Sequence, residues 1–236
     1  MHHRDSLTNI PSVIQASFNV TLGKHAVNVT RDIKAGEELL VSYVDPAQRL
    51  RNRAFNLERF GVDCSCSICV PGKAHDTSEK RRKQIEQIVA GLAVYDGAKP
   101  LMVKVPDIVP DTPDLALTMA ETAIEVAGKE QLVNMYVAKL HRQAAKYALQ
   151  ERRIEKAKSH AQREAKVERI CLGEETTYLN DRDVREGGGN AAAWLKYIEE
   201  VAKKDQVNIR MCEKREAKER KHAAKKAEKK AAKGKR

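Results

Sequence analysis

Apolar and polar residues alternate over the first thirty positions, a pattern typical of β-strands. Val27 and Val29 alternate with polar neighbours, as expected for a strand with one buried face. Two such runs, 13–20 and 25–30, flank a short segment that contains Gly23. Strand-like runs separated by a glycine-containing turn predict a β-hairpin at this end of the chain.

The pattern that follows the hairpin changes from strand to helix. The apolar run 38–44 predicts a third strand. A helix is predicted over 45–60, because Asp45 is a good N-terminal cap and Pro46 fits the first turn. Gly61 is expected to end this helix, since glycine readily adopts the left-handed conformation found after helix C-termini.

Beyond residue 76 the apolar residues recur at helical spacing. We expect a helix over 77–95, capped by Thr77 or Ser78, and then a loop that contains several prolines. Residues 114–200 predict antiparallel helices, the last of which covers 190–203. Their alanine-rich pairs loosely resemble a tetratricopeptide helix pair, a weak match because many helical hairpins produce it.

These patterns predict an α+β fold, in which a strand-rich N-terminal part precedes a helical one. Aromatic residues make up only 4% of the chain, which favours aliphatic helix packing over an aromatic-rich β-sandwich. We expect four segments: a strand-rich unit, a helix with a proline-rich linker, a helical bundle and a basic tail, at 1–70, 71–113, 114–203 and 204–236.

The net charge of +11 lies almost entirely in the tail. Residues 201–236 contain 15 lysines and arginines and 5 acidic residues, so they carry +10 and the other 200 residues about +1. The simplest prediction is a solvated helix or a disordered arm. Nuclear import, or weak contact of residues 214–236 with nucleic acid or an acidic protein, is the alternative. No aromatic residue follows Tyr197, so base stacking is not expected.

No apolar run approaches the roughly 18–20 residues that span a bilayer, so no membrane partner is expected. The N-terminus shows no apolar segment resembling a signal peptide. The chain has 5 cysteines, an odd number, and two of them lie far apart at Cys171 and Cys212. This usage is typical of an intracellular, reduced protein.

Three cysteines fall within six residues, at Cys64, Cys66 and Cys69. In a reduced protein this spacing predicts a zinc site, because the sulfurs reach one ion at little cost in loop closure. A closed structural site needs four ligands. His75 is a candidate for the fourth; a distant cysteine is a second option and a three-coordinate site a third.

Together with these cysteines, the first seventy residues resemble a SET domain with its post-SET segment. The resemblance rests on Phe18 and Asn19, the run 31–39, Ser42 and Tyr43, and the cysteine spacing. The short arginine-rich helix before the cysteines, and the helical region after them, make the chain similar to SET–MYND (SMYD-type) protein-lysine methyltransferases and their fungal relatives.

The resemblance implies a specific activity. SET enzymes transfer a methyl group from S-adenosylmethionine to a lysine of a protein substrate, histone or non-histone, in the nucleus or cytoplasm. Tyr43 matches the catalytic tyrosine, which orients the lysine amine. Val62 occupies the position of the aromatic that stacks on the adenine, and the neighbouring Phe60 is the residue able to compensate.

The chain also departs from the family pattern. The family's Asn-His-Ser-Cys motif, whose first two residues help to hold the cofactor, is replaced here by a segment in which Ser6 and Leu7 take those positions. Asn9 stands where the family has its fourth zinc-binding cysteine. The glycine-rich strand of the SET N-terminal half has no counterpart.

We therefore expect an incomplete or weakly active methyltransferase. The alternative is a catalytically inactive SET remnant that acts as a protein-interaction module. A nucleic-acid-binding zinc module is disfavoured, since the loop 64–70 contains no basic residue.

Overall fold

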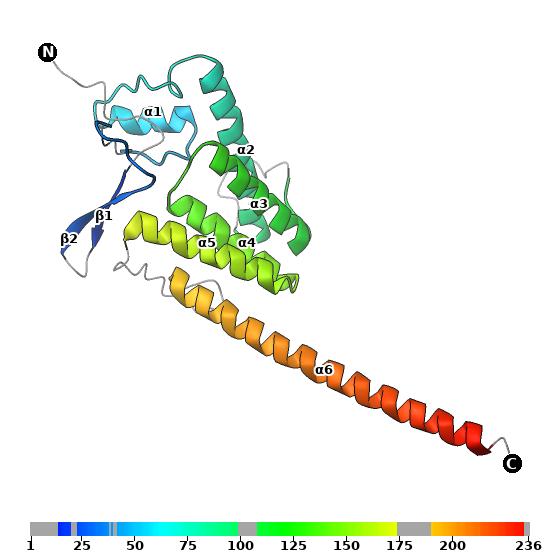
Figure 1. The fold of residues 1–236 in the computed structure, drawn as a ribbon. Helices are drawn as coiled ribbons and strands as arrows, with labels where there is room; N and C mark the ends of the chain where they lie inside the picture. The colour runs from blue at the N-terminus through cyan, green and yellow to red at the C-terminus, as the bar shows by residue number, and fades with distance from the viewer. Residues whose placement is uncertain are drawn as a thin grey trace.

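The computed structural model describes residues 14–19, 23–37, 39, 42–98, 108–173 and 190–233. Within these ranges the chain is mostly helical, with a single β-hairpin at the N-terminal side (Figure 1). The elements in chain order are β1 (Ile14–Asn19), β2 (Lys24–Val29), α1 (Leu50–Glu58), α2 (Lys73–Tyr95), α3 (Pro113–Lys129), α4 (Met135–Gln150), α5 (Ile154–Leu172) and α6 (Ala191–Lys233).

The hairpin predicted from the alternating pattern is confirmed. Strands β1 and β2 pair in antiparallel fashion, with Ile14 opposite Val29 and Phe18 opposite His25. Gly23 has a φ of +61°, a conformation that glycine adopts without steric cost. Both strands contact α5, so the hairpin is held against the C-terminal half of the helical region.

The third strand predicted over 38–44 is not found in the residues of that run that the structure describes. Leu39 and residues 42–44 have no strand pairing. The Ser42 hydroxyl donates instead to the Val44 carbonyl oxygen at 2.6 Å, a local bond that competes with a strand ladder. Among the described residues the α+β prediction therefore holds only as one hairpin with many helices; the partial SET β-fold and the tetratricopeptide-like repeat stay predictions.

Helix α1 is shorter at its start than predicted. The Asp45 carboxylate accepts from the Ala47 amide at 2.9 Å, so it caps a turn that ends before the helix begins. The helix begins at Leu50, whose amide donates to the Glu79 carboxylate on α2 at 2.7 Å. A residue from another helix thus supplies the acceptor for the first turn. The predicted end at Gly61 is confirmed, since this residue has a φ of +63°.

Helix α2 begins earlier than predicted, at Lys73. The Thr77 hydroxyl is not a cap, because it donates to the Lys73 carbonyl oxygen within the helix at 2.8 Å. Ser78 is not a cap either: it is buried and donates to Glu130 at 2.5 Å. Neither hydroxyl is used to cap a first turn, so neither residue marks the start of the helix.

The main core lies where α2 to α5 pack together and is closed by the start of α6. Alanines line it, so the helices approach closely. Its fully buried residues include Leu92, Ala120, Ala144, Ala161 and Ile198. None of the described helices is both long and apolar enough to cross a membrane.

Two histidines form a buried pair inside this core. His141 Nδ1 lies 3.1 Å from His160 Nδ1, and His160 Nε2 lies 3.2 Å from the Glu121 carboxylate on α3. If His160 donates from Nε2 to Glu121, its Nδ1 must accept, so His141 carries its proton on Nδ1. Burial, with the neighbouring His160, lowers the pKa of His141 to about 4. Burial also lowers the pKa of His160.

Acidification is expected to destabilise the protein through this pair. Because the folded-state pKa of His141 is about 4 and the unfolded value about 6.5, the unfolded chain takes up the proton first as pH falls. The contribution of neutral His141 to the free energy of unfolding is complete above about pH 6.5 and is lost towards pH 4, with about 2 kcal/mol lost at pH 5. Urea unfolding of wild type and His141→Gln at pH 7 and 5 measures this loss. An equal pH dependence in both proteins would contradict the assignment.

Helix α6 is longer than predicted. It was expected to end near residue 203, yet it continues to Lys233. The continuation is rich in alanine, lysine and glutamate, which have high helix propensity. In Figure 1 this helix leaves the helical body and runs on alone.

Candidate metal centre and its surroundings

The cysteine cluster, Cys64, Cys66 and Cys69, directly follows α1. After Gly61 turns the chain, the Cys66 carbonyl oxygen accepts from the Cys69 amide at 2.9 Å and from the Val70 amide at 3.0 Å. This tight turn returns the third thiol towards the first two. All three sulfur atoms lie within 4.8 Å of one another.

This arrangement fits a zinc ion. A tetrahedral zinc with sulfur ligands at about 2.3 Å places those sulfurs about 3.8 Å apart, so only a small contraction of the cluster is needed. Thiolates are soft ligands suited to zinc. Cys66 is buried, and Cys64 and Cys69 are partly buried, so a bound ion would be shielded from water on one side.

A buried arginine lies beside the cluster. Arg53 on α1 is fully buried, and its Nη2 lies 3.7 Å from Cys69 Sγ. Its Nη1 donates to the Gln48 carbonyl oxygen at 2.6 Å. Three thiolates around one divalent zinc carry a net negative charge, which this guanidinium offsets. Arg53 is therefore placed to hold Cys69 in the orientation of a metal ligand.

The same surroundings change the pKa of the Cys69 thiol. Hydrogen bonding to Cys66, together with burial, raises the pKa of the Cys69 thiol, whereas the hydrogen bond from Arg53 acts in the opposite direction. Without a cation the cluster therefore favours the protonated thiols. Metal binding and thiol deprotonation are expected to be coupled.

A second buried cation, Arg82 on α2, lies near Arg53 and Cys69. Arg82 Nη2 lies 3.2 Å from the Glu130 carboxylate, and its Nε donates to the Ser78 hydroxyl at 2.9 Å. Arg81 adds a contact to the same carboxylate at 3.1 Å. Burial lowers the pKa of Arg82, as does the nearby Arg53. This network ties α2 to the end of α3, and Arg82 Nη1 reaches the Gln48 carbonyl oxygen just before α1 at 3.5 Å.

The structure does not bring His75 into the thiol cluster. His75 lies on the first turn of α2, and its Nδ1 is 3.0 Å from the Ile68 carbonyl oxygen, inside the cysteine loop. Among the described residues the three cysteines alone form a group with metal-ligand spacing. Cys171 is buried at the end of α5 and is not part of it. The side chain of Cys212 is outside the described residues.

The aromatic residues singled out from the sequence lie next to this loop. The Tyr43 and Phe60 rings are in contact, with centroids 5.6 Å apart and planes tilted by 39°. Both are exposed, at 43% and 59%. Ser6 and Leu7 lie outside the described residues.

A groove of about 710 Å³ runs between α1 and the cysteine loop. Val62 and Phe55 line it, together with the backbone turn at Gly61 and two cysteines of the cluster. Its volume is in the range of sites that take small organic ligands. The groove places a ligand-sized space directly against the candidate metal centre.

Sequence reasoning missed the charged residues that support the cluster. Arg53 was noted only as one of several arginines in a short helix, and Glu79 and Glu130 were not singled out. The one available signal was the spacing of Arg53 and Leu57, which are four residues apart and both buried. That spacing predicts that the two side chains share one face of the helix. It does not predict whether a charged side chain on that face is buried, or which residue pairs with it.

Comparison with protein-family models found no match. Among curated proteins, the chain is 36% identical over 86 residues to histone-lysine N-methyltransferase set5 of Schizosaccharomyces pombe, a match over 35% of this chain and 25% of the relative. It is 44% identical over 45 residues, or 19% of this chain, to SET5 of Yarrowia lipolytica, and 46% identical over 57 residues, or 24% of this chain, to SET5 of Meyerozyma guilliermondii. The matches span 10% and 12% of those two relatives.

The chain thus spans no more than about a quarter of the length of the curated relatives it matches. Over part of its length, it is similar to fungal proteins named as histone-lysine N-methyltransferases.

Proposed function

We propose that this chain is part of a SET-domain protein-lysine methyltransferase of the SET–MYND-like type, with residues 64–69 as its post-SET zinc site. One observation carries the proposal: three thiols gather into one soft-metal donor set directly after α1, with the Tyr43 and Phe60 rings in contact beside them. The partial similarity to fungal histone-lysine N-methyltransferases supports the same family.

In this proposal zinc has a structural role. The three thiolates hold it, and Arg53 balances their charge from the α1 side. A fourth ligand is required for a closed site. His75 is the candidate within this chain, because its Nδ1 contact with the Ile68 carbonyl leaves Nε2 as the nitrogen available to a metal. Its imidazole would have to move towards the cluster on metal binding.

S-adenosylmethionine would supply the methyl group from its sulfonium. The Tyr43 hydroxyl would hold the target lysine amine in line with that methyl, contributing by orientation more than by proton transfer. Phe60 would offer an aromatic face to the adenine, with Val62 lining the adjoining groove. Exposed aromatic and aliphatic surface of this kind suits a desolvated cofactor pocket.

The substrate would be a lysine-containing protein, and the printed names of the relatives point to histones. A histone substrate implies a nuclear location. The replacement of the family's cofactor-holding motif by Ser6 and Leu7 removes an amide and an imidazole from the pocket. Weak cofactor binding and weak activity are therefore expected of this chain.

The experiment is calorimetric titration of S-adenosylmethionine into the zinc-loaded protein. Weak but saturable binding, complete below millimolar cofactor, is the expected result. Phe60→Ala should weaken it at least tenfold, whereas Val70→Ala, an exposed apolar residue of the same loop, should change it less than twofold. Tyr43→Phe should bind normally but lose at least about 10²-fold in methyl transfer to histone peptides, because orientation of the amine is lost.

The second candidate function is an inactive SET-derived module that binds a protein partner. The contact between the exposed rings of Tyr43 and Phe60, at 43% and 59%, favours it, since adjacent exposed aromatics are typical of interaction surfaces. No cofactor binding up to millimolar concentration, in protein that is folded by circular dichroism and contains zinc, would overturn the enzyme proposal and leave this one.

A further inference from the structure

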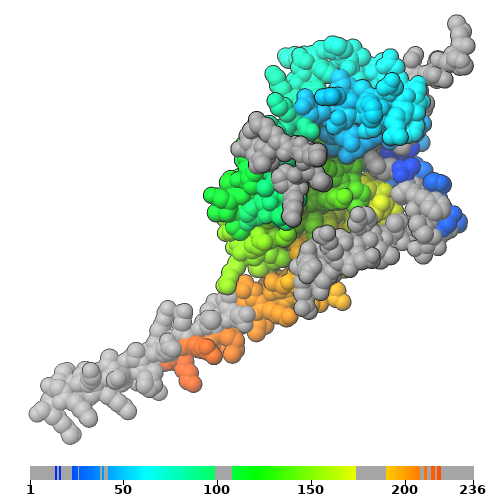
Figure 2. All heavy atoms as spheres, turned by 180° about the vertical axis from the view of Figure 1, so that it is seen from behind, coloured from blue at the N-terminus to red at the C-terminus, as the bar shows by residue number. Residues whose placement is uncertain are grey.

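The outer part of α6 projects from the protein as a single helix. Its first turns pack against α5 through Trp194 and Ile198, both at most 1% exposed. Ala202 is the last buried residue of α6 among those whose side chains the structure describes. Figure 2 shows the start of this helix lying along the body and its continuation leaving it. From residue 203 to Lys233 the helix extends about 45 Å.

Acidic residues are nearly absent from one face of this projecting part, although basic residues also occur elsewhere around the helix. At about 100° per residue, one set of basic positions falls within a sector of about 100°, and we call it the basic stripe. Asp205 and the acidic positions 213, 216 and 219 lie on the other side of the helix, with Glu228 the exception. The basic stripe consists of residues 203, 210, 214, 218, 221, 225 and 229.

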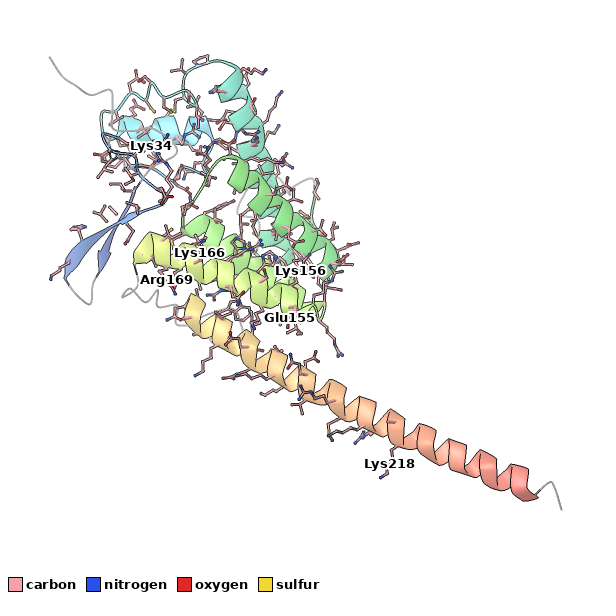
Figure 3. All side chains as sticks on the ribbon, viewed as in Figure 1. Lys34, Glu155, Lys156, Lys166, Arg169 and Lys218 are labelled. Carbon is pink, nitrogen blue, oxygen red and sulfur yellow. The ribbon has the colours of Figure 1, made fainter. Side chains whose placement is uncertain are left out.

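The described residues of the basic stripe lie on the face of α6 opposite to the one that packs on the protein body. By the same helical register, Trp194 and Ile198, which pack against α5, lie on the opposite face. Arg210, Lys214 and Lys218 are exposed, and in the part of the chain that the structure describes none of them takes part in an ion pair. Figure 3 shows Lys218 extending from α6 well clear of the helical body.

We propose that the basic stripe binds the phosphate backbone of a nucleic-acid duplex. A duplex is a straight polyanion with about one charge per 1.7 Å of axis, which matches a straight row of cations that continues for about 39 Å. The contact is electrostatic and independent of base sequence, since no aromatic residue follows Tyr197 to stack on bases. This activity is separate from methyl transfer and does not depend on it.

The residues of α6 favour phosphate over a protein groove. A helix that docks into a groove needs apolar anchors over several turns. Val207 and Met211 are exposed, at 58% and 52%, but they lie one turn apart at the body end of the stripe. From Cys212 to the end of the chain, alanine is the only other apolar residue.

The test is fluorescence anisotropy of the full chain with two labelled 20-base-pair DNA duplexes of unrelated sequence. We expect equal affinity for both within about twofold. Because log affinity falls with log salt by about 0.9 per phosphate neutralised, four or five contacts should weaken binding by about 10²-fold between 50 and 200 mM salt. A single strand of the same sequence should bind more weakly.

A charge-conserving variant tests the stripe itself. Lys214→Glu and Lys218→Glu combined with Glu213→Lys and Glu219→Lys keep the net charge but move two cations off the stripe. Duplex affinity should fall at least tenfold, with helix content unchanged by circular dichroism.

The matched control is Arg220→Gln with Lys230→Gln, which removes two cations from positions off the stripe and should cost less than threefold. Wild-type affinity in the charge-conserving variant would overturn the proposal. Binding of the wild type to polyglutamate but not to duplex at 50 mM salt would also overturn it, in favour of an acidic protein partner.

Discussion

Removal of zinc with a chelator is expected to unfold the cysteine loop and to loosen α1 from α2. Structural zinc in small peptides contributes on the order of 10 kcal/mol at neutral pH, and here it would join three cysteines of the loop 61–70. Cys66→Ser should have the same effect, because Cys66 is the most buried of the three ligands. Hydrogen exchange should show protection lost in the loop and in α1 while α4 stays protected.

The zinc prediction has a close control in Ser65→Ala. Ser65 is exposed and lies between two ligands, so this change should leave the metal content at one zinc per chain and the melting temperature within about a degree. Purified protein that contains no zinc, and whose melting temperature a chelator does not change, would contradict the metal assignment. Neither measurement depends on methyl transfer.

Glu130→Ala is expected to destabilise the protein by about 3–5 kcal/mol, because it leaves the fully buried Arg82 without its carboxylate. It also removes the acceptor of the Ser78 hydroxyl, a second buried group. Glu125→Ala, in the last turns of α3, removes an exposed partner of Lys129 and should leave the stability almost unchanged. Urea unfolding of the three proteins measures the difference.

A double variant separates the loss of a partner from the loss of packing. Arg82→Met with Glu130→Leu replaces the buried pair by apolar side chains of similar size, which removes the unpaired charge. Its cost should be smaller than the sum of the two single changes by at least about 1 kcal/mol. Additive costs, or a Glu130→Ala variant as stable as wild type, would show that the pair does not hold α2 to the end of α3.

The elements that were predicted well depend on neighbouring residues. The hairpin follows from alternating residues and Gly23, and the end of α1 follows from Gly61. The cysteine cluster follows from the spacing of three thiols, since the chain has little freedom to separate them. In each case the deciding contacts join residues that are close in the sequence, the most distant being Ile14 and Val29 at the open end of the hairpin.

The elements that were predicted wrongly depend on distant partners. Residues 42–44 are apolar enough for a strand, but a strand also needs an edge to pair with, and among the described residues β1 and β2 pair only with each other. The start of α1 was misplaced because its cap is Glu79, which lies 29 residues further along the chain.

By itself, the sequence determined the hairpin, the succession of helices, the thiol spacing and the separation of charge between the body and the tail. Only the tertiary structure decided that Arg53 lies against Cys69, and that Glu130 neutralises Arg82 from 48 residues away. It also decided that Arg210, Lys214 and Lys218 are exposed on a helix that leaves the body. The physical reason is that the cost of burying a charge depends on its partner in space. No local pattern of residues specifies that partner until the helices have packed.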